Sequence, residues 1–174
     1  GVIMADAIHE MILQSIKAAE SCYYRLVLLV GKTGTGKTAV LQNLARHYGT
    51  ELINVNLELS RELLELTPVQ RSLRMPRILG DLVSRYQSPV LLDNLEILFD
   101  KDLKQDPLGV LQGLSRNRTI VASWNGVTTA GKLLYAEFGH PEYRSYDSAD
   151  ALIVGMDHTA TIISAQDTGG AREQ

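Results

Sequence analysis

Residues that crosslink a chain, and apolar runs that cross a membrane, are scarce in this sequence. It has one cysteine, Cys22, in 174 residues, so an internal disulfide and a cysteine-based zinc site are both excluded. No apolar run approaches the roughly 18 residues that a transmembrane helix requires, and no signal-peptide pattern opens the chain. We therefore expect a cytoplasmic protein with no membrane partner.

Positive charge is not in excess either. The 17 lysine and arginine residues stand against 20 aspartate and glutamate residues, a formal net charge of -3 at pH 7. No bulk positive field draws the chain to nucleic acid, so its net charge does not support DNA contact. The four histidines lack the spacing of metal ligands, and we assign no metal beyond an ion bound with a nucleotide.

The apolar pattern predicts one α/β domain over 1–163, with an N-terminal helix in 1–22 packed on it and a flexible tail at 164–174. Helices are expected at 5–20, 39–47, 60–86 with interruptions near Thr67 and at Pro76, and in 94–114 with a break at Asp106. Strands are expected at 26–30, 51–59, 90–92, 119–124, 151–154 and 160–163, with a hairpin arm at 132–138 closed by a turn at 139–141. Alternating strands and helices predict a mostly parallel sheet covered on both faces.

A glycine-rich loop follows the first expected strand. Its residues match the pattern G-x-x-x-x-G-K-[ST] in full: Gly31, Lys32, Thr33, Gly34, Thr35, Gly36, Lys37 and Thr38. Glycines let backbone N–H groups approach phosphate oxygens, and the N-terminus of the next helix favours the same anion. Lys37 should reach the β- and γ-phosphates, and the Thr38 hydroxyl should bind Mg²⁺. The motif predicts binding of Mg-ATP in a three-layer P-loop NTPase fold without a separate lid domain.

A second element completes the expected nucleotide site. The apolar run 88–92 ends at Asp93, which is the form of a Walker B strand, and this carboxylate can hold Mg²⁺ beside Thr38. In the additional-strand P-loop ATPases, which this pattern resembles, a glutamate usually follows and activates water. Asn94 stands there instead, and an amide can orient water but cannot accept its proton. Glu96 is a candidate substitute base, although helical geometry would turn it away from Asn94; the alternative is that it caps or solvates the next helix.

Other polar residues allow two interpretations each. Asn125 ends the strand 119–124 and is a candidate sensor of the γ-phosphate, as in AAA+ ATPases, or part of an Asn-Gly turn. Arg116 and Arg118 lie before that strand and are candidates for an arginine finger toward a neighbouring subunit, or solvated loop residues. Arg144 is a further candidate. A basic stripe formed by Arg71, Arg74 and Arg77 would be disrupted by Pro76.

Four stretches resemble one known family. The segments 55–60, 91–96, 105–119 and 139–143 resemble the BrxF family of small P-loop proteins from type 3 BREX bacteriophage-defence systems. The resemblance covers nearly the whole chain and includes Asn94. It implies a bacterial, cytoplasmic nucleotide-binding component that acts with other BREX proteins against phage DNA, but it implies no particular reaction.

Four functions compete on these observations. The leading one is an ATP-binding switch or assembly subunit that self-associates and hydrolyses ATP weakly or with help from a partner. A small P-loop kinase is the second, although no arginine-rich lid or second substrate pocket is recognisable in the sequence. A GTPase is disfavoured because no Asn-Lys-x-Asp motif occurs. The last is a DNA-binding module that uses nucleotide only structurally.

Overall fold

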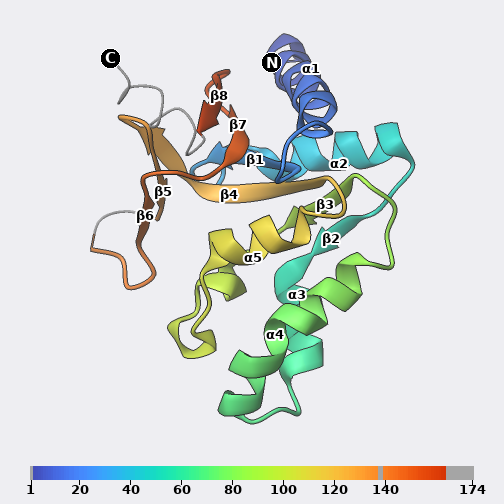
Figure 1. The fold of residues 1–174 in the computed structure, drawn as a ribbon. Coiled ribbons are helices and arrows are strands. Elements are labelled where there is room, and N and C mark those ends of the chain that lie inside the picture. Colours follow the sequence, from blue (N-terminus) through green and yellow to red (C-terminus); the bar gives the residue numbers. More distant parts are fainter. Residues whose placement is uncertain (1, 137–138, 164–174) are drawn as a thin grey trace.

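A computed structural model of the chain describes residues 2–136 and 139–163, and it shows a mostly parallel sheet with helices on its sides (Figure 1). The helices are α1 Val2–Ala19, α2 Lys37–Tyr48, α3 Val55–Leu63, α4 Pro68–Val83 and α5 Pro107–Leu114, and the short 3-10 helices are η1 Glu96–Phe99 and η2 Lys101–Leu103. The strands are β1 Leu26–Gly31, β2 Leu52–Asn54, β3 Val90–Asp93, β4 Ile120–Thr129, β5 Lys132–Tyr135, β6 Arg144–Tyr146, β7 Ala151–Gly155 and β8 Ala160–Ile163. The predicted α/β class is confirmed.

The strands run in the order β2-β3-β4-β1-β7-β8. Five of them are parallel, and β8 pairs with β7 in the antiparallel direction. Parallel strands bring the ends of β1, β3, β4 and β7 to one edge of the sheet, where ligands bind in folds of this kind. None of the helices in the described part of the chain is long and apolar enough to span a bilayer.

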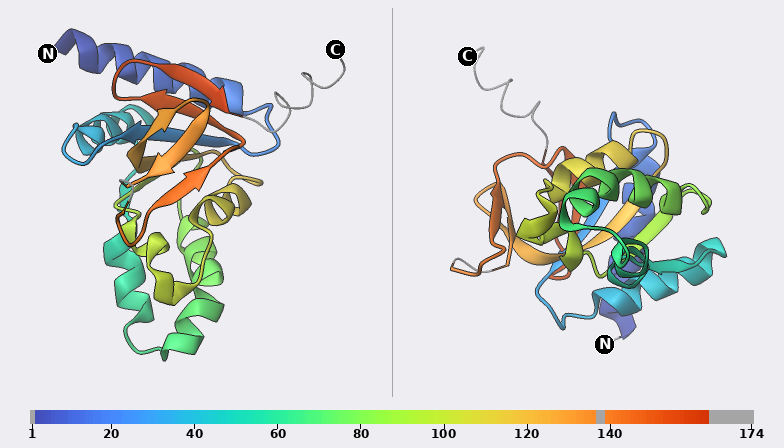
Figure 2. Two further views of the ribbon diagram at one scale, coloured as in Figure 1. Left: turned by 90° about the vertical axis from the view of Figure 1, so that its left-hand side faces the viewer. Right: turned by 90° about the horizontal axis from the view of Figure 1, so that it is seen from below.

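The sheet is buried on both faces because its central strands are apolar throughout. Alternate residues of β1 point to opposite sides: Val27 and Leu29 belong to a core with α1 and α2, whereas Leu28 and Val30 belong to a core with α3, α4 and α5. Figure 2 shows the two helical layers on opposite sides of the sheet, with α3 and α4 extending farthest from it. The tail expected at 164–174 lies outside the described residues.

The strand expected at 51–59 is wrong beyond Asn54. The chain leaves β2 there and starts α3, because the Asn54 side chain accepts a hydrogen bond from the Leu57 N–H at 3.1 Å and caps the new helix. Val55, Leu59 and Leu63 are all buried and recur every four residues, which is a helical spacing. The alternation of Val55 and Leu57 with asparagines concealed this longer period.

The interruption expected at Pro76 is also wrong, since α4 continues through it. Proline has no N–H, so the Ser72 carbonyl four residues earlier loses its helical partner. The Gln105 side chain donates a hydrogen bond to that carbonyl at 2.7 Å and replaces the missing donor. A capping box between Thr67 and Gln70 starts the helix, as the proline after Thr67 suggested.

The Asn-Gly pair at 125–126 is not a turn, because β4 continues to Thr129. The last residues of β4, Gly126 to Thr129, pair with β5 after a turn at Ala130 and Gly131, and β5 pairs with β6. A Cβ on Gly126 would lie 1.8 Å from the Leu134 carbonyl oxygen, so only glycine permits this pairing. The hairpin arm expected at 132–138 is confirmed over β5; residues 137–138 lie outside the described part. The resulting β4-β5-β6 extension stands beside the glycine-rich loop.

Candidate functional site

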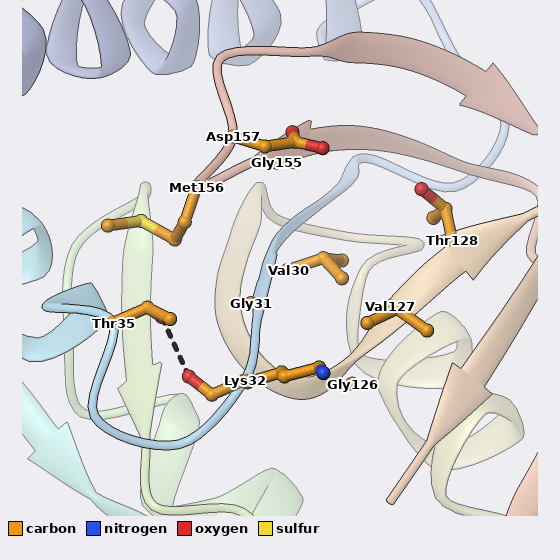
Figure 3. A pocket seen from close by; sticks show the side chains of 10 residues that line it. All are labelled: Val30, Gly31, Lys32, Thr35, Gly126, Val127, Thr128, Gly155, Met156 and Asp157. Carbon is orange, nitrogen blue, oxygen red and sulfur yellow. Dashed lines mark hydrogen bonds between the residues drawn. The ribbon is translucent and has the colours of Figure 1, made fainter. Parts of the chain in front are cut away.

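The glycine-rich loop, residues 31–38, connects the end of β1 to the start of α2. Gly34 and Gly36 have φ angles of 84° and 95°, a conformation that glycine adopts without strain, and Gly36 precedes the first turn of α2. Thr33, Gly34 and Thr35 are exposed, and the Thr35 hydroxyl donates to the Lys32 carbonyl at 2.7 Å (Figure 3). The loop therefore presents backbone N–H groups and a helix N-terminus at the sheet edge, as the motif requires.

Lys37 is the cation inside this loop. Its side chain is 6% exposed, and Nζ donates to the carbonyl oxygens of Gly31 at 2.7 Å and Lys32 at 2.9 Å. Burial lowers the pKa of the ammonium group, while the carboxylates of Asp93 and Glu96 act in the opposite direction. These contacts hold the ammonium against the first two carbonyl groups of the loop.

Asp93 joins the loop to two strands. It is buried at the end of β3, and its two oxygens accept hydrogen bonds of 2.6 Å each, from the Thr38 and Ser123 hydroxyls. Carboxylate and hydroxyl oxygens are suitable Mg²⁺ ligands. The described residues contain no group of three or more acidic, histidine or cysteine side chains that would hold a metal alone. An ion at Thr38 and Asp93 therefore needs further oxygens, such as those of a phosphate.

Glu96 faces the site, contrary to the geometry expected for a helix. Its carboxylate oxygens accept hydrogen bonds from the amides of Asn125 at 2.8 Å and Asn56 at 2.9 Å. Asn125 lies in β4 directly opposite Gly31 of β1, so the Glu96 carboxylate is fixed beside the loop. Asn56 also accepts a hydrogen bond from the Ile97 N–H at 2.7 Å, which locks its side chain.

Asn94 explains why Glu96 is turned inward. Its φ of 55° is left-handed, so the chain after β3 does not enter a helix directly, and η1 begins only at Glu96. The Asn94 carbonyl accepts a hydrogen bond from the Asn56 N–H at 2.9 Å. Asparagine is one of the few residues that adopt this conformation readily, so backbone geometry accounts for an amide residue at this position.

Two hollows flank the loop. The first has a volume of about 490 Å³ and lies between the ends of β1, β4 and β7 (Figure 3). Met156 fills part of it and approaches so closely that a Cβ on Gly31 would lie 2.8 Å from the Met156 Cγ. Asp157 at its rim accepts hydrogen bonds from the Thr159 hydroxyl and N–H, which lower the pKa of the carboxyl group. The one carboxylate that lines this hollow is therefore already hydrogen-bonded to Thr159.

The second hollow has a volume of about 1060 Å³ and adjoins the loop at Lys32 and Thr33. Its lining includes Lys32 and Thr33 of the loop, Glu96, Asn125 of β4 and Tyr135 of β5, together with residues 140, 142 and 143. A space of this size accommodates a small molecule. It supplies the room for a second ligand that the sequence did not reveal.

Arg116 and Arg118 do not join this site within the chain. Arg116 stacks its guanidinium 3.7 Å from the Tyr23 ring centroid, and Arg118 donates to the Val83 carbonyl at 3.1 Å. Both precede β4, whose start pairs with the start of β1 at the opposite end from the loop. Arg144 lies in β6. A finger role toward another subunit stays a prediction for all three.

Three side chains of the site are not predicted as site residues from the sequence. Ser123 was detectable as a lone polar residue in an apolar strand, but Asn56 was assigned to a strand, and Tyr135 had no signal at all. Comparison with known proteins adds nothing to this geometry: no family model, no curated protein and no solved structure matches the chain.

Proposed function

We propose that this chain binds Mg-ATP on the glycine-rich loop and belongs to the P-loop NTPases. The observation that carries the proposal is the 2.6 Å hydrogen bond between the Thr38 hydroxyl and Asp93, which joins the loop to an acid 55 residues away. A loop that matched the motif by chance would have no reason to place its last hydroxyl against a buried carboxylate. Lys37 and the N–H groups at the start of α2 bind phosphate oxygens, and Thr38 with Asp93 holds the Mg²⁺ that ATP brings.

Hydrolysis, in this proposal, depends on Glu96 and not on Asn94. Glu96 carries a carboxylate that lines the second hollow and is held beside the loop through Asn125, so it is the group placed to take a proton from an attacking water. Both of its oxygens already accept a hydrogen bond from an amide, so an attacking water has to compete with an amide for them. Turnover is therefore slow unless a ligand or partner draws an amide away.

This slow turnover suits a nucleotide-dependent switch or assembly subunit. ATP would favour the loop and strand-end conformation that contacts its γ-phosphate, and self-association or partner docking would follow from that preference. The resemblance of four segments to the BrxF family supports a place in a bacterial anti-phage BREX complex. That assignment, and ATP as the nucleotide, belong to the proposal.

Binding is tested by calorimetric titration of the purified chain with ATP and a non-hydrolysable analogue, with and without Mg²⁺. Lys37→Ala should remove measurable binding, Asp93→Ala should remove the Mg²⁺-dependent part, and Lys101→Ala, in the exposed start of η2, is the matched control. A wild-type chain that binds neither ligand would refute the proposal. GTP binding tighter than ATP binding would replace the nucleotide but keep the site.

Catalysis needs a separate test. Glu96→Gln should lower the ATP turnover number at least about tenfold with little change in ATP affinity, since a base acts on the chemical step. Asn94→Gly should leave turnover within about threefold of wild type, because glycine keeps the backbone conformation. If Asn94→Gly abolished turnover while Glu96→Gln did not, the assignment of the base would be wrong.

One observation favours a second candidate, a small P-loop kinase. The second hollow lies on the phosphate side of the loop and gives an acceptor molecule room beside Glu96. Incubation with γ-labelled ATP and a panel of hydroxyl and amine acceptors separates the two functions. Label that moves to an acceptor identifies a kinase, whereas label that appears only as inorganic phosphate identifies an ATPase.

A further inference from the structure

The wall of the second hollow includes the hydroxyl group of a buried tyrosine. Tyr135 is 5% exposed, lines the hollow, and makes no side-chain hydrogen bond to any residue in the described ranges 2–136 and 139–163. Its ring is held in place by stacking on Phe99 and by an edge contact with Trp124 at a centroid distance of 5.7 Å. No group of the described residues satisfies this hydroxyl, so it is open to a hydrogen bond with a molecule in the hollow.

Negative charge gathers around this hydroxyl. Glu96 and Glu142 both line the hollow. Burial is the main cause that raises the pKa of Tyr135 above its ordinary value, and the negative charges of these two carboxylates raise it further. Lys32 stands at the loop end of the hollow. The His140 Nδ1 already accepts a hydrogen bond from the Glu142 N–H at 3.0 Å, so it is not a free acceptor for a ligand.

These groups together specify the chemistry of the occupant. Two carboxylates and a neutral phenol oxygen are all acceptors, so they suit a cation with several N–H donors. Guanidinium and primary ammonium groups have that character, and the apolar side chains of Val127 and Leu134 in the same wall suit the aliphatic stem attached to such a group. A phosphate or carboxylate group would be repelled by the two carboxylates.

We propose that the second hollow binds a cationic guanidinium or ammonium group, which pairs with Glu142 and Glu96 and donates a hydrogen bond to the Tyr135 hydroxyl. The cation belongs to a small molecule or to an arginine or lysine side chain of a second copy of this chain. The position of the cation beside the terminal phosphate rests on the proposed function, but its binding does not, because Glu142, Glu96 and Tyr135 line the hollow themselves.

The test is a titration of the nucleotide-free chain with arginine amide, followed by the fluorescence of Trp124, the one tryptophan of the sequence. Citrulline amide has the same shape without the charge, and it should bind at least about tenfold more weakly. Glu142→Gln should weaken arginine amide binding by about tenfold, and Tyr135→Phe, which keeps the stacked ring, by severalfold. Asp147→Asn, an exposed acid just beyond β6, is the control and should change nothing.

Three results would overturn the proposal: no arginine amide binding, equal binding of citrulline amide, or unchanged binding by Glu142→Gln. Light scattering then distinguishes the sources. Self-association that arginine amide reverses supports a side chain from a second copy, and a chain that binds it while monomeric supports a separate molecule. Arginine amide binding by a chain that fails to bind Mg-ATP would sink the proposed function alone, and the reverse pattern would sink only the cation site.

Discussion

Replacement of Asn94 separates a conformational role from a chemical one. Its φ of 55° is left-handed, and a residue with a Cβ and no local hydrogen-bonding side chain pays about 1–2 kcal/mol to adopt it. Glycine adopts it without that penalty but loses more entropy on folding. We therefore expect Asn94→Ala to be about 1 kcal/mol less stable than Asn94→Gly, which corresponds to a melting temperature lower by about 2–4 °C. Asn94→Glu should lose similar stability.

The assay is urea unfolding of both variants, and Asn43 supplies the control. Asn43 is exposed inside α2, where alanine is favoured over glycine, so Asn43→Ala should be about 1 kcal/mol more stable than Asn43→Gly. The order of the two substitutions thus reverses between the two sites. Equal stabilities of Asn94→Ala and Asn94→Gly would refute the backbone explanation. Faster ATP turnover by Asn94→Glu than by wild type would refute the choice of Glu96 as base.

Three further predictions concern the surroundings of the site. Gly126→Ala places a Cβ 1.8 Å from the Leu134 carbonyl, and urea unfolding should show a loss of about 3 kcal/mol or failure to fold; Gly131→Asn, at a turn position with φ of 77°, should fold normally. Gln105→Ala leaves the Ser72 carbonyl without a donor and should cost about 1 kcal/mol by the same method, whereas an equal stability would mean that water replaces the amide. Above about pH 10, the unfolded chain loses the Tyr135 proton while the folded chain keeps it, because the folded-state pKa is raised. The free energy of unfolding should therefore fall by about 1.4 kcal/mol per pH unit for this group. The fall of that free energy with pH should be shallower in Tyr135→Phe.

The sequence was sufficient to predict the features with short-range causes. The apolar strand β1, the loop after it and the acid at the end of β3 follow from local composition, and a parallel sheet brings strand ends together. The contact between Thr38 and Asp93 was therefore predictable from two motifs. For Asn125 the sequence allows a sensor and a turn equally, because an Asn-Gly pair by itself does not distinguish a strand end from a turn. Pairing of β4 with β5, which needs the glycine at 126, decided against the turn.

Features with long-range causes were not predictable in this way. The continuation of α4 through Pro76 depends on an amide 29 residues farther along the chain, which no local rule includes. The inward position of Glu96 depends on the left-handed Asn94 and on Asn56, which was assigned to a strand. The place of the Tyr135 hydroxyl in the wall of the second hollow follows only from the pairing of β5 with β4. In each case one side chain from a distant segment changes the outcome.

The network around Glu96 provides a physical route for the proposed switch. Its carboxylate is held by Asn125, which is opposite the loop, and by Asn56, which lies in the first turn of α3. A γ-phosphate that takes the Asn125 amide as a donor leaves Glu96 with the Asn56 amide alone, so one carboxylate oxygen can accept a hydrogen bond from water and the carboxylate is freer to turn. Any such turn pulls on the start of α3. The α3–α4 pair carries exposed apolar side chains, among them Leu64 and Leu73, so a nucleotide-driven shift there would change a surface suited to protein contact. Asn56→Ala should therefore raise basal ATP turnover and weaken the dependence of partner binding on nucleotide. If neither quantity changes in this variant, the network only supports the fold.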